Sequence, residues 1–264
     1  VQKIYEFPER GYIYDRNNKL IVSNDFSYDI LVVPADVNLE DSILISKDFN
    51  IDTSVFNEKL LDAKNFSNVK ASILINNISK DEYAPIQEKL WKHSGFFVQK
   101  KSKRTYNALT AANLLGYISE VNKSEVEKNS YYEIGEMIGR QGLEKTYEDK
   151  LRGVKGVKFF QKDKFNRIIG SYKNGDYDTL PIPSKDLTLT IDLDLQQYGD
   201  SLMQNKRGSI VAIEPKTGDI LALINSPSYD LSSLIDKNRS INYKKLENDS
   251  IGKPLFERGL QGQY

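Results

Sequence analysis

The chain has 264 residues, of which 39% are hydrophobic and 28% are charged, the composition of an ordinary water-soluble globular protein. Lys and Arg together number 37, as do Asp and Glu, so the charge balance predicts no nucleic-acid partner. With no cysteine and a single histidine, His93, the chain has no thiol chemistry, and a Ser-His-Asp triad or a multi-histidine metal site is disfavoured. No metal or cofactor is expected.

The sequence contains no run of about 18 apolar residues, the length that a membrane-spanning helix needs. It begins at Val1 rather than Met, and we interpret it as a piece of a longer protein from which any signal or membrane anchor is absent. Its many Tyr, Phe and β-branched residues predict a large share of strand.

Strand signals dominate the first part of the chain. Residues 10–24 are expected to form a hairpin, because Asn17 and Asn18 can supply the positive φ angles of a tight turn. Residues 27–37 predict another strand, which ends near Pro34 because proline has no N–H to donate to a sheet.

Helix and strand signals then alternate. Residues 41–64 look partly helical, and a capping box at 79–82 opens a helix that Gly95 is expected to end. Residues 96–106 are predicted to be extended. A short helix that stops at Gly116 is followed by a further strand.

A helix bordered by glycines follows. Gly139 and Gly142 lead into it, and Gly153 is expected to end it. Its apolar positions recur at every fourth residue, at Leu143, Tyr147 and Leu151. Residues 157–172 predict a second hairpin. The segment 173–186 is rich in Gly, Pro, Asp and Ser and predicts a domain boundary.

The pattern changes after this boundary. Residues 186–192 alternate as a strand does, and Asp192 or Asp194 is expected to cap a helix. The apolar face of that helix is predicted to consist of Leu195, Tyr198 and Leu202. Residues 209–214 and 220–225 are nearly continuous apolar runs, which predict strands buried on both faces.

Lys216-Thr217-Gly218 lies between these two runs and matches one of three signatures of the penicillin-recognising serine acyltransferases. Pro215 and Gly218 suit the turn of a hairpin, where Lys216 would face water. A catalytic triplet of this kind should instead lie along a strand that lines a substrate groove. We therefore interpret the triplet as a turn.

Two S-x-x-K matches, at Ser67 and Ser250, would be catalytic only with the serine at the start of a helix and the lysine one turn later. Pro254 disfavours the helical conformation for Lys253, and the residues after Ser67 predict a strand. About two such matches are expected by chance. We assign no catalytic role to these serines or to Lys216.

Several long stretches together resemble the class B penicillin-binding proteins. Residues 8–34 resemble the family's R-G-x-I-x-D-R-N-G opening, with Asn18 in place of the last Gly. Residues 138–153 match its G-x-x-G-x-E-x-x-Y-x-x-x-L-x-G segment at every fixed position. Residues 186–230 and 254–264 resemble the first part of the family's transpeptidase domain.

The resemblance implies an α+β fold, with a β-rich, elongated pedestal followed by the first strands and helix of a penicillin-recognising α/β transpeptidase domain. The pedestal, a dimerisation-type domain, would span 1–180. Its anchor lobe would comprise 1–35 and 130–180, with an inserted head at about 36–129, and 181–264 would begin the transpeptidase domain.

The resemblance is closest to the elongation type and implies a serine-type peptidoglycan D,D-transpeptidase that cross-links stem peptides and is acylated by β-lactams. In the family the nucleophile comes almost directly after the residues that resemble 261–264, so this chain would lack it. The implied partners are a membrane glycosyltransferase and elongation-complex proteins. The implied location is the periplasmic side of a bacterial inner membrane, with a single-pass anchor.

Two alternatives stay open at this point. The chain could be a non-catalytic interaction module that contacts a membrane glycosyltransferase and cell-shape scaffold proteins, or a division-type member of the same family.

Charged residues and glycines of the family patterns carry the structural predictions. Arg10 is expected to pair with Glu144, with Glu148 one helical turn further along. The basic run at 99–104 is predicted to be a solvated strand face, and His93 to interact with the dipole of a helix C-terminus. A structural or interaction role is assigned to Arg10, Gly11, Asp15, Arg16, Gly139, Gly142, Glu144, Tyr147 and Gly153.

Overall fold

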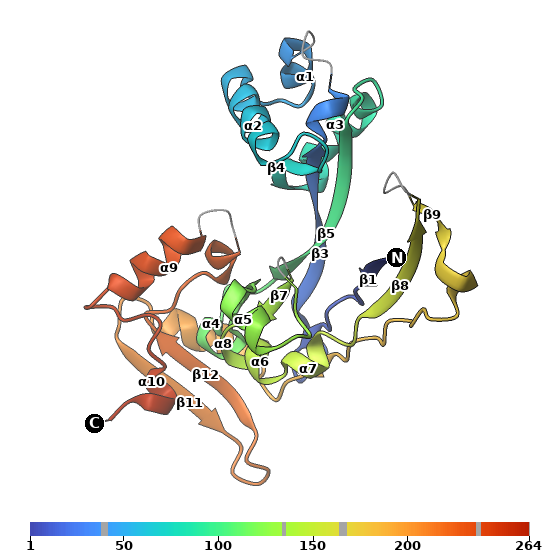
Figure 1. Cartoon of the computed structure of the whole chain (residues 1–264). Helices are drawn as coiled ribbons and strands as arrows, with labels where there is room; N and C mark the ends of the chain where they lie inside the picture. Colours follow the sequence, from blue (N-terminus) through green and yellow to red (C-terminus); the bar gives the residue numbers. More distant parts are fainter. Residues whose placement is uncertain (38–41, 134–135, 164–167, 236–238, 264) are drawn as a thin grey trace. The chain divides into compact units, whose positions relative to one another are not determined.

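A computed structural model describes the chain except for residues 38–41, 134–135, 164–167, 236–238 and 264 (Figure 1). The chain divides into two compact units: residues 25–103 form the smaller one, and 1–24 together with 104–264 form the larger one. The chain enters the smaller unit along strand β3 (Leu20–Val32) and returns along β5 (Phe96–Tyr106).

The smaller unit is a sheet with helices packed on it. Strand β3 pairs with β4 (Ser72–Ile78) and with β5. The helices are α1 (Ser42–Asp48), α2 (Thr53–Phe66) and α3 (Lys80–Leu90). Their apolar side chains and those of the sheet form one core, which includes Ile30, Phe49, Phe56, Leu60, Leu74, Ile86 and Phe96.

The larger unit contains short sheets, some of which join strands that are distant in sequence. In the first sheet β8 (Gly156–Lys162) lies between β1 (Gln2–Glu6) and β9 (Ile168–Ser171), and in the second β2 (Ile13–Tyr14) pairs with β3 on one side and with the parallel β10 (Leu187–Thr188) on the other. Two further sheets have two strands each: β6 (Ile118–Glu120) pairs with β7 (Met137–Gly139), and β11 (Gly208–Ile213) pairs with β12 (Ile220–Ser226).

Short helices connect and cover these sheets. They are α4 (Ala112–Leu115), α5 (Lys123–Lys128), α6 (Gly142–Thr146), α7 (Glu148–Leu151), α8 (Leu193–Leu202), α9 (Arg239–Asn248) and α10 (Arg258–Gln261). The buried core joins the first hairpin to much later segments, and it includes Ile13, Val22, Tyr106, Leu115, Leu151 and Leu234.

The structure confirms the α+β class and the main local signals. Asn18 has a φ angle of 61° in the turn between β2 and β3. The Ser79 hydroxyl and the Glu82 side chain form the predicted capping box, and Gly116 follows the last residue of α4. Strands β8 and β9 pair as predicted, while the expected turn at 164–167 lies outside the described residues.

Three predicted elements have different bounds in the structure. The strand predicted at 27–37 is the second half of β3, because no Pro or Gly interrupts the strand before Pro34. Helix α3 ends at Leu90, ahead of Gly95, where the chain tightens into a turn. The single helix predicted after Gly142 is two helices, α6 and α7, because Tyr147 between them has a φ of −106° and a ψ of 22°, outside the helical region.

Helix α8 begins after the predicted cap, Asp192, but buries the opposite face from the predicted one. The Gln196 side chain accepts from the Leu223 N–H at 2.7 Å and donates to the Leu223 carbonyl at 3.0 Å. A Cβ at Gly199 would lie 2.5 Å from Ile224 Cδ1, so only glycine lets the helix approach β12 this closely. The apolar face is exposed and consists of Leu195, Tyr198 and Leu202.

The strands predicted at 209–214 and 220–225 are β11 and β12, and they differ in how far their apolar side chains are buried. Ala222, Leu223 and Ile224 on β12 are buried, whereas Val211 and Ile213 on β11 are 40% and 56% exposed. The difference arises because α8 packs against β12 rather than β11.

The compact units have bounds of their own. The smaller unit covers 25–103, because β3 and β5 enter and leave it as continuous strands, and the inserted head at about 36–129 stays a prediction. Residues on both sides of position 180 belong to the larger unit, so the boundary expected there stays a prediction.

The backbone of Gly139 in β7 lies directly against α6. A Cβ at this position would lie 2.0 Å from the Glu144 carbonyl oxygen, a backbone atom that cannot rotate away. We expect Gly139→Ala to lower the free energy of unfolding by about 1–3 kcal/mol, measured as the urea midpoint. Gly170→Ala is the matched control, since a Cβ there meets no atom within 4 Å. Equal midpoints for the two variants would contradict this expectation.

Candidate functional site

The Lys216 triplet lies in the turn between β11 and β12, as predicted. The Gly218 N–H donates to the Glu214 carbonyl at 2.8 Å, and Gly218 has a φ of 79°. Lys216 is exposed at the tip of this hairpin. The triplet therefore has the geometry of a turn.

Neither S-x-x-K match has the helical geometry that an acylated serine requires. Ser67 follows the last residue of α2, and its hydroxyl accepts from the Lys70 backbone N–H at 3.2 Å. Ser250 lies in a turn after α9, and Lys253 has a φ of 43°, in the left-handed region. In neither case does the lysine side chain lie one helical turn after the serine, so proton transfer between them is not set up.

The charged residues of the family patterns do come together, in a buried cluster of the larger unit. Arg10 Nε donates to Glu144 Oε2 at 2.7 Å, and Arg10 Nη2 donates to Glu148 Oε2 at 2.6 Å. Arg10 and Glu144 are 134 positions apart in sequence. The predicted pair is thus present, and the second carboxylate binds the same guanidinium.

A second arginine, Arg104, completes the cluster. Its Nε donates to Glu144 Oε1 at 2.7 Å, and both side chains are 0% exposed. Each oxygen of Glu144 therefore accepts from a different arginine. The solvated strand face predicted for 99–104 is wrong at this position. Arg104 shares a strand face with the buried Tyr106 two residues later, but this spacing does not show the carboxylate that a buried arginine needs.

Neutral groups bind several other polar atoms of the cluster, although Arg104 Nη2 is buried without a hydrogen-bond partner. Asn24 donates to the Arg10 carbonyl and accepts from Arg104 Nη1 at 2.9 Å. Glu148 accepts from the Gly139 N–H at 2.9 Å and from the Tyr132 hydroxyl at 3.3 Å. These contacts tie β7, α6 and α7 to the first hairpin and to β5.

The electrostatics of the cluster favour its charged forms. Burial opposes the charge on Arg10, but Glu144 and Glu148 together raise the pKa of Arg10 above its ordinary value. Burial and the neighbouring Glu148 carboxylate raise the pKa of Tyr132 to about 12. Both oxygens of Glu144 are bound to arginines and the side chain is shielded from water, so we interpret the cluster as structural rather than catalytic.

The remaining predicted residues position the backbone around this cluster. The buried Asp15 carboxylate accepts from the N–H groups of Asn17 and Lys19 at 2.8 and 2.7 Å and so forms the turn of the first hairpin. Gly11 donates from its N–H to the Leu151 carbonyl at 2.8 Å.

The other positions fall into two groups. Gly142 and Gly153 have positive φ angles of 59° and 65°, which favour glycine. The side chains of Arg16 and Tyr147 are exposed and do not reach the buried ion pairs, although the Arg16 N–H donates to the Ile191 carbonyl at 3.0 Å.

His93 has a different partner from the one predicted. Its Nε2 lies 3.0 Å from Asp48 Oδ2 at the end of α1, so a carboxylate rather than a helix dipole is its partner. His93 and Lys89 together hold the pKa of Asp48 below its ordinary value. Among the described residues, no cluster of three or more His, Cys, Asp or Glu side chains could hold a metal ion, and no helix has the length and apolarity to cross a membrane.

A substitution at Glu144 tests how much the buried ion pairs contribute to the free energy of unfolding. Glu144→Gln leaves two buried arginines with one carboxylate, so we expect the free energy of unfolding to fall by about 3–5 kcal/mol. Asp194→Asn is the control, because it removes one partner of the Lys19–Asp194 pair, whose side chains are 47% and 70% exposed, and should cost less than about 1 kcal/mol. Urea unfolding measures both. A loss of similar size in the two variants would show that burial of the cluster contributes little.

Known proteins share both the sequence and the fold. Residues 5–189 match the family described as the penicillin-binding protein dimerisation domain. The peptidoglycan D,D-transpeptidase MrdA of Acinetobacter baumannii is 30% identical over 97% of this chain and 38% of its own length. MrdA of Escherichia coli K12 is 30% identical over 97% and 41%. The chain thus spans less than half of these relatives.

A solved complex between PBP2 and MreC from Helicobacter pylori aligns with a TM-score of 0.78, covering 97% of this chain and 48% of that one. Its 24% sequence identity supports the fold alone. The family match covers most of the described sequence and includes every residue of the ion-pair cluster, Arg10, Arg104, Glu144 and Glu148. The chain therefore belongs to the penicillin-binding proteins, through their dimerisation domain.

Proposed function

We propose that this chain is the pedestal and the start of the catalytic domain of an elongation-type peptidoglycan D,D-transpeptidase. The observation that carries the proposal is the alignment of 97% of the chain, at 30% identity, with relatives that are named as such transpeptidases. The chain covers 38–41% of their length. Its 1–180 and 181–264 parts take the roles of pedestal and first strands of the transpeptidase domain.

In the proposed reaction a serine attacks the D-Ala-D-Ala carbonyl of a stem peptide, D-Ala leaves, and an amine of a neighbouring stem peptide takes the acyl group. β-Lactams acylate the same serine. We assign this nucleophile to the part of the relatives' length that the chain does not match, because Ser67 and Ser250 both lack a helix that places a lysine beside them.

Within this function the larger unit is a rigid support. The buried Arg10, Arg104 and Glu144 side chains hold distant segments in one arrangement, which suits a domain that must present a catalytic part at a fixed place. We propose a periplasmic location, with a single-pass anchor in the inner membrane.

The contacts of the pedestal are the second part of the proposal. The solved Helicobacter pylori PBP2 is in complex with MreC, and 97% of the present chain aligns with its fold. We infer that the pedestal contacts an elongation-complex protein and a membrane glycosyltransferase. A chain with only these contacts would be a non-catalytic interaction module, and labelling by a β-lactam distinguishes that alternative.

We expect the 264-residue chain to form no covalent adduct with a fluorescent penicillin, because neither serine match is helical and Lys216 lies in a turn. Intact mass after incubation measures this directly, and a polypeptide extended to the full length of the relatives is the positive control. An added mass of one penicillin on the 264-residue chain would overturn the assignment, with Ser67→Ala and Ser250→Ala locating the site. A full-length protein that also resists labelling would favour the interaction module.

A further inference from the structure

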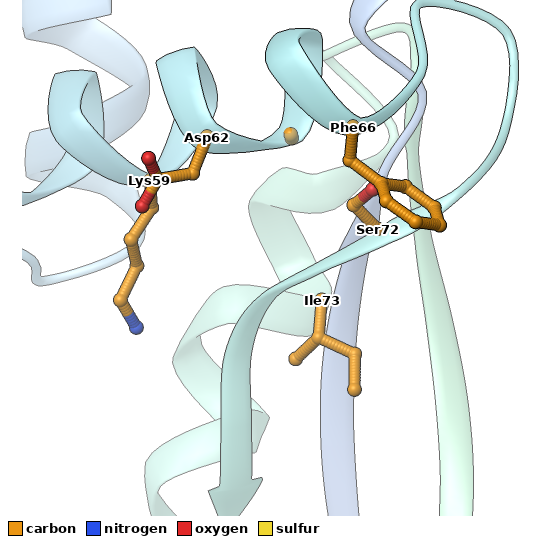
Figure 2. A pocket seen from close by; sticks show the side chains of 6 residues that line it. Lys59, Asp62, Phe66, Ser72 and Ile73 are labelled. Atoms are coloured by element: carbon orange, nitrogen blue, oxygen red, sulfur yellow. The ribbon is translucent and has the colours of Figure 1, made fainter. Parts of the chain in front are cut away.

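A pocket opens in the smaller unit between helix α2 and the start of strand β4 (Figure 2). Its volume is about 280 Å³, and it is lined by Lys59, Asp62, Ala63, Phe66, Ser72 and Ile73. The four residues from α2 follow the spacing of one helical face, so the pocket is a groove between a helix and a strand.

The strand that forms this groove lies at the edge of its sheet. Among the described residues, β4 pairs with β3 and with no other strand. Lys59 Nζ donates to the Leu74 carbonyl of β4 at 2.9 Å, so a mobile side chain occupies one acceptor of the strand. Unpaired backbone groups at a sheet edge can pair with an added strand, and a groove between an edge strand and a helix guides such a segment.

The walls of the pocket combine apolar and polar groups. Phe66 and Ile73 are 74% and 50% exposed and provide apolar surface at one end of the pocket. The Ser72 hydroxyl is buried and has no hydrogen-bond partner. At the other end, beside Lys59, the exposed Asp62 carboxylate makes no hydrogen bond or ion pair within the described part of the chain (Figure 2).

This combination fits a side chain with an apolar stem and a cationic head. The stem of a lysine or arginine packs on apolar surface while its charge stays with polar groups, and an aromatic ring adds a cation–π contact. The pocket's own cation, Lys59, is directed to the Leu74 carbonyl and leaves Asp62 without a bonded partner. The charge that complements the open carboxylate is therefore positive.

We propose that the groove between α2 and β4 binds an extended, basic segment of a partner protein. The segment pairs with unpaired backbone groups at the edge of β4, while the Lys59 amine stays on the Leu74 carbonyl. Its Lys or Arg stem packs against Phe66 and Ile73, and its charged head binds Asp62. This binding site is independent of the proposed transpeptidase function.

The test uses the ¹⁵N-labelled 264-residue chain and the acetylated, amidated peptide Thr-Val-Thr-Arg-Thr-Val-Thr, followed by NMR. We expect amide shifts confined to 59–66 in α2 and to 72–76 in β4. A matched peptide with citrulline in place of arginine, which removes the charge and keeps the shape, should bind about 3–10-fold more weakly. Asp62→Asn should abolish the preference for arginine, whereas Glu58→Gln, on the same helix and outside the pocket lining, should keep it.

Three results would overturn the proposal. The first is the absence of shifts in β4 at millimolar peptide, and the second is equal binding of the arginine and citrulline peptides. The third concerns the variant Lys59→Met, which leaves the Leu74 carbonyl at the edge of β4 without its lysine donor. If sedimentation shows this variant to be a dimer that the arginine peptide does not dissociate, the edge belongs to a second copy of the chain rather than to a basic segment.

Discussion

The buried carboxylate of Glu144 is the constraint on which the larger unit depends. It lies between Arg10 from the first hairpin and Arg104 from the returning strand β5, and neither Arg104 nor Glu144 is exposed to water. A buried charge without its partners is strongly destabilising, so these segments must be brought together for any of them to be stable where they lie. The apolar core around Leu151 and Ile13 belongs to the same arrangement of segments that these ion pairs hold together.

The same constraint explains why the cluster supports function without performing chemistry. Each Glu144 oxygen accepts from a different guanidinium, and Glu148 accepts from Arg10, Tyr132 and the Gly139 N–H. Carboxylates with this many donors hold the neighbouring segments in place, because each hydrogen bond fixes a different part of the chain. A support of this kind suits a pedestal, whose task is to maintain geometry while bond-making occurs elsewhere.

The smaller unit has a different character. Its core is apolar, built from β3, β4, β5 and three helices, and the half-exposed Lys101 pairs with the buried Asp29 of β3. An edge strand protected by one lysine and flanked by an open carboxylate is suited to recognition of another chain. One unit therefore uses charge to fix an internal arrangement, and the other presents charge beside an unpaired strand.

The sequence by itself determined the local elements whose cause is local. The Asn18 turn, the Ser79–Glu82 capping box and the Pro215–Gly218 hairpin depend on residues only a few positions apart, and the family pattern correctly placed Arg10 with Glu144. The tertiary structure alone decided the burial of Arg104 and the orientation of α8. The basic run at 99–104 predicts exposure to solvent, but Arg104 is buried because it pairs with Glu144. The apolar face of Leu195, Tyr198 and Leu202 predicts burial, but α8 buries its other face because Gln196 bonds to Leu223. The physical reason is that a buried charge or amide is stable only opposite a partner distant in sequence, and periodicity does not reveal such a partner.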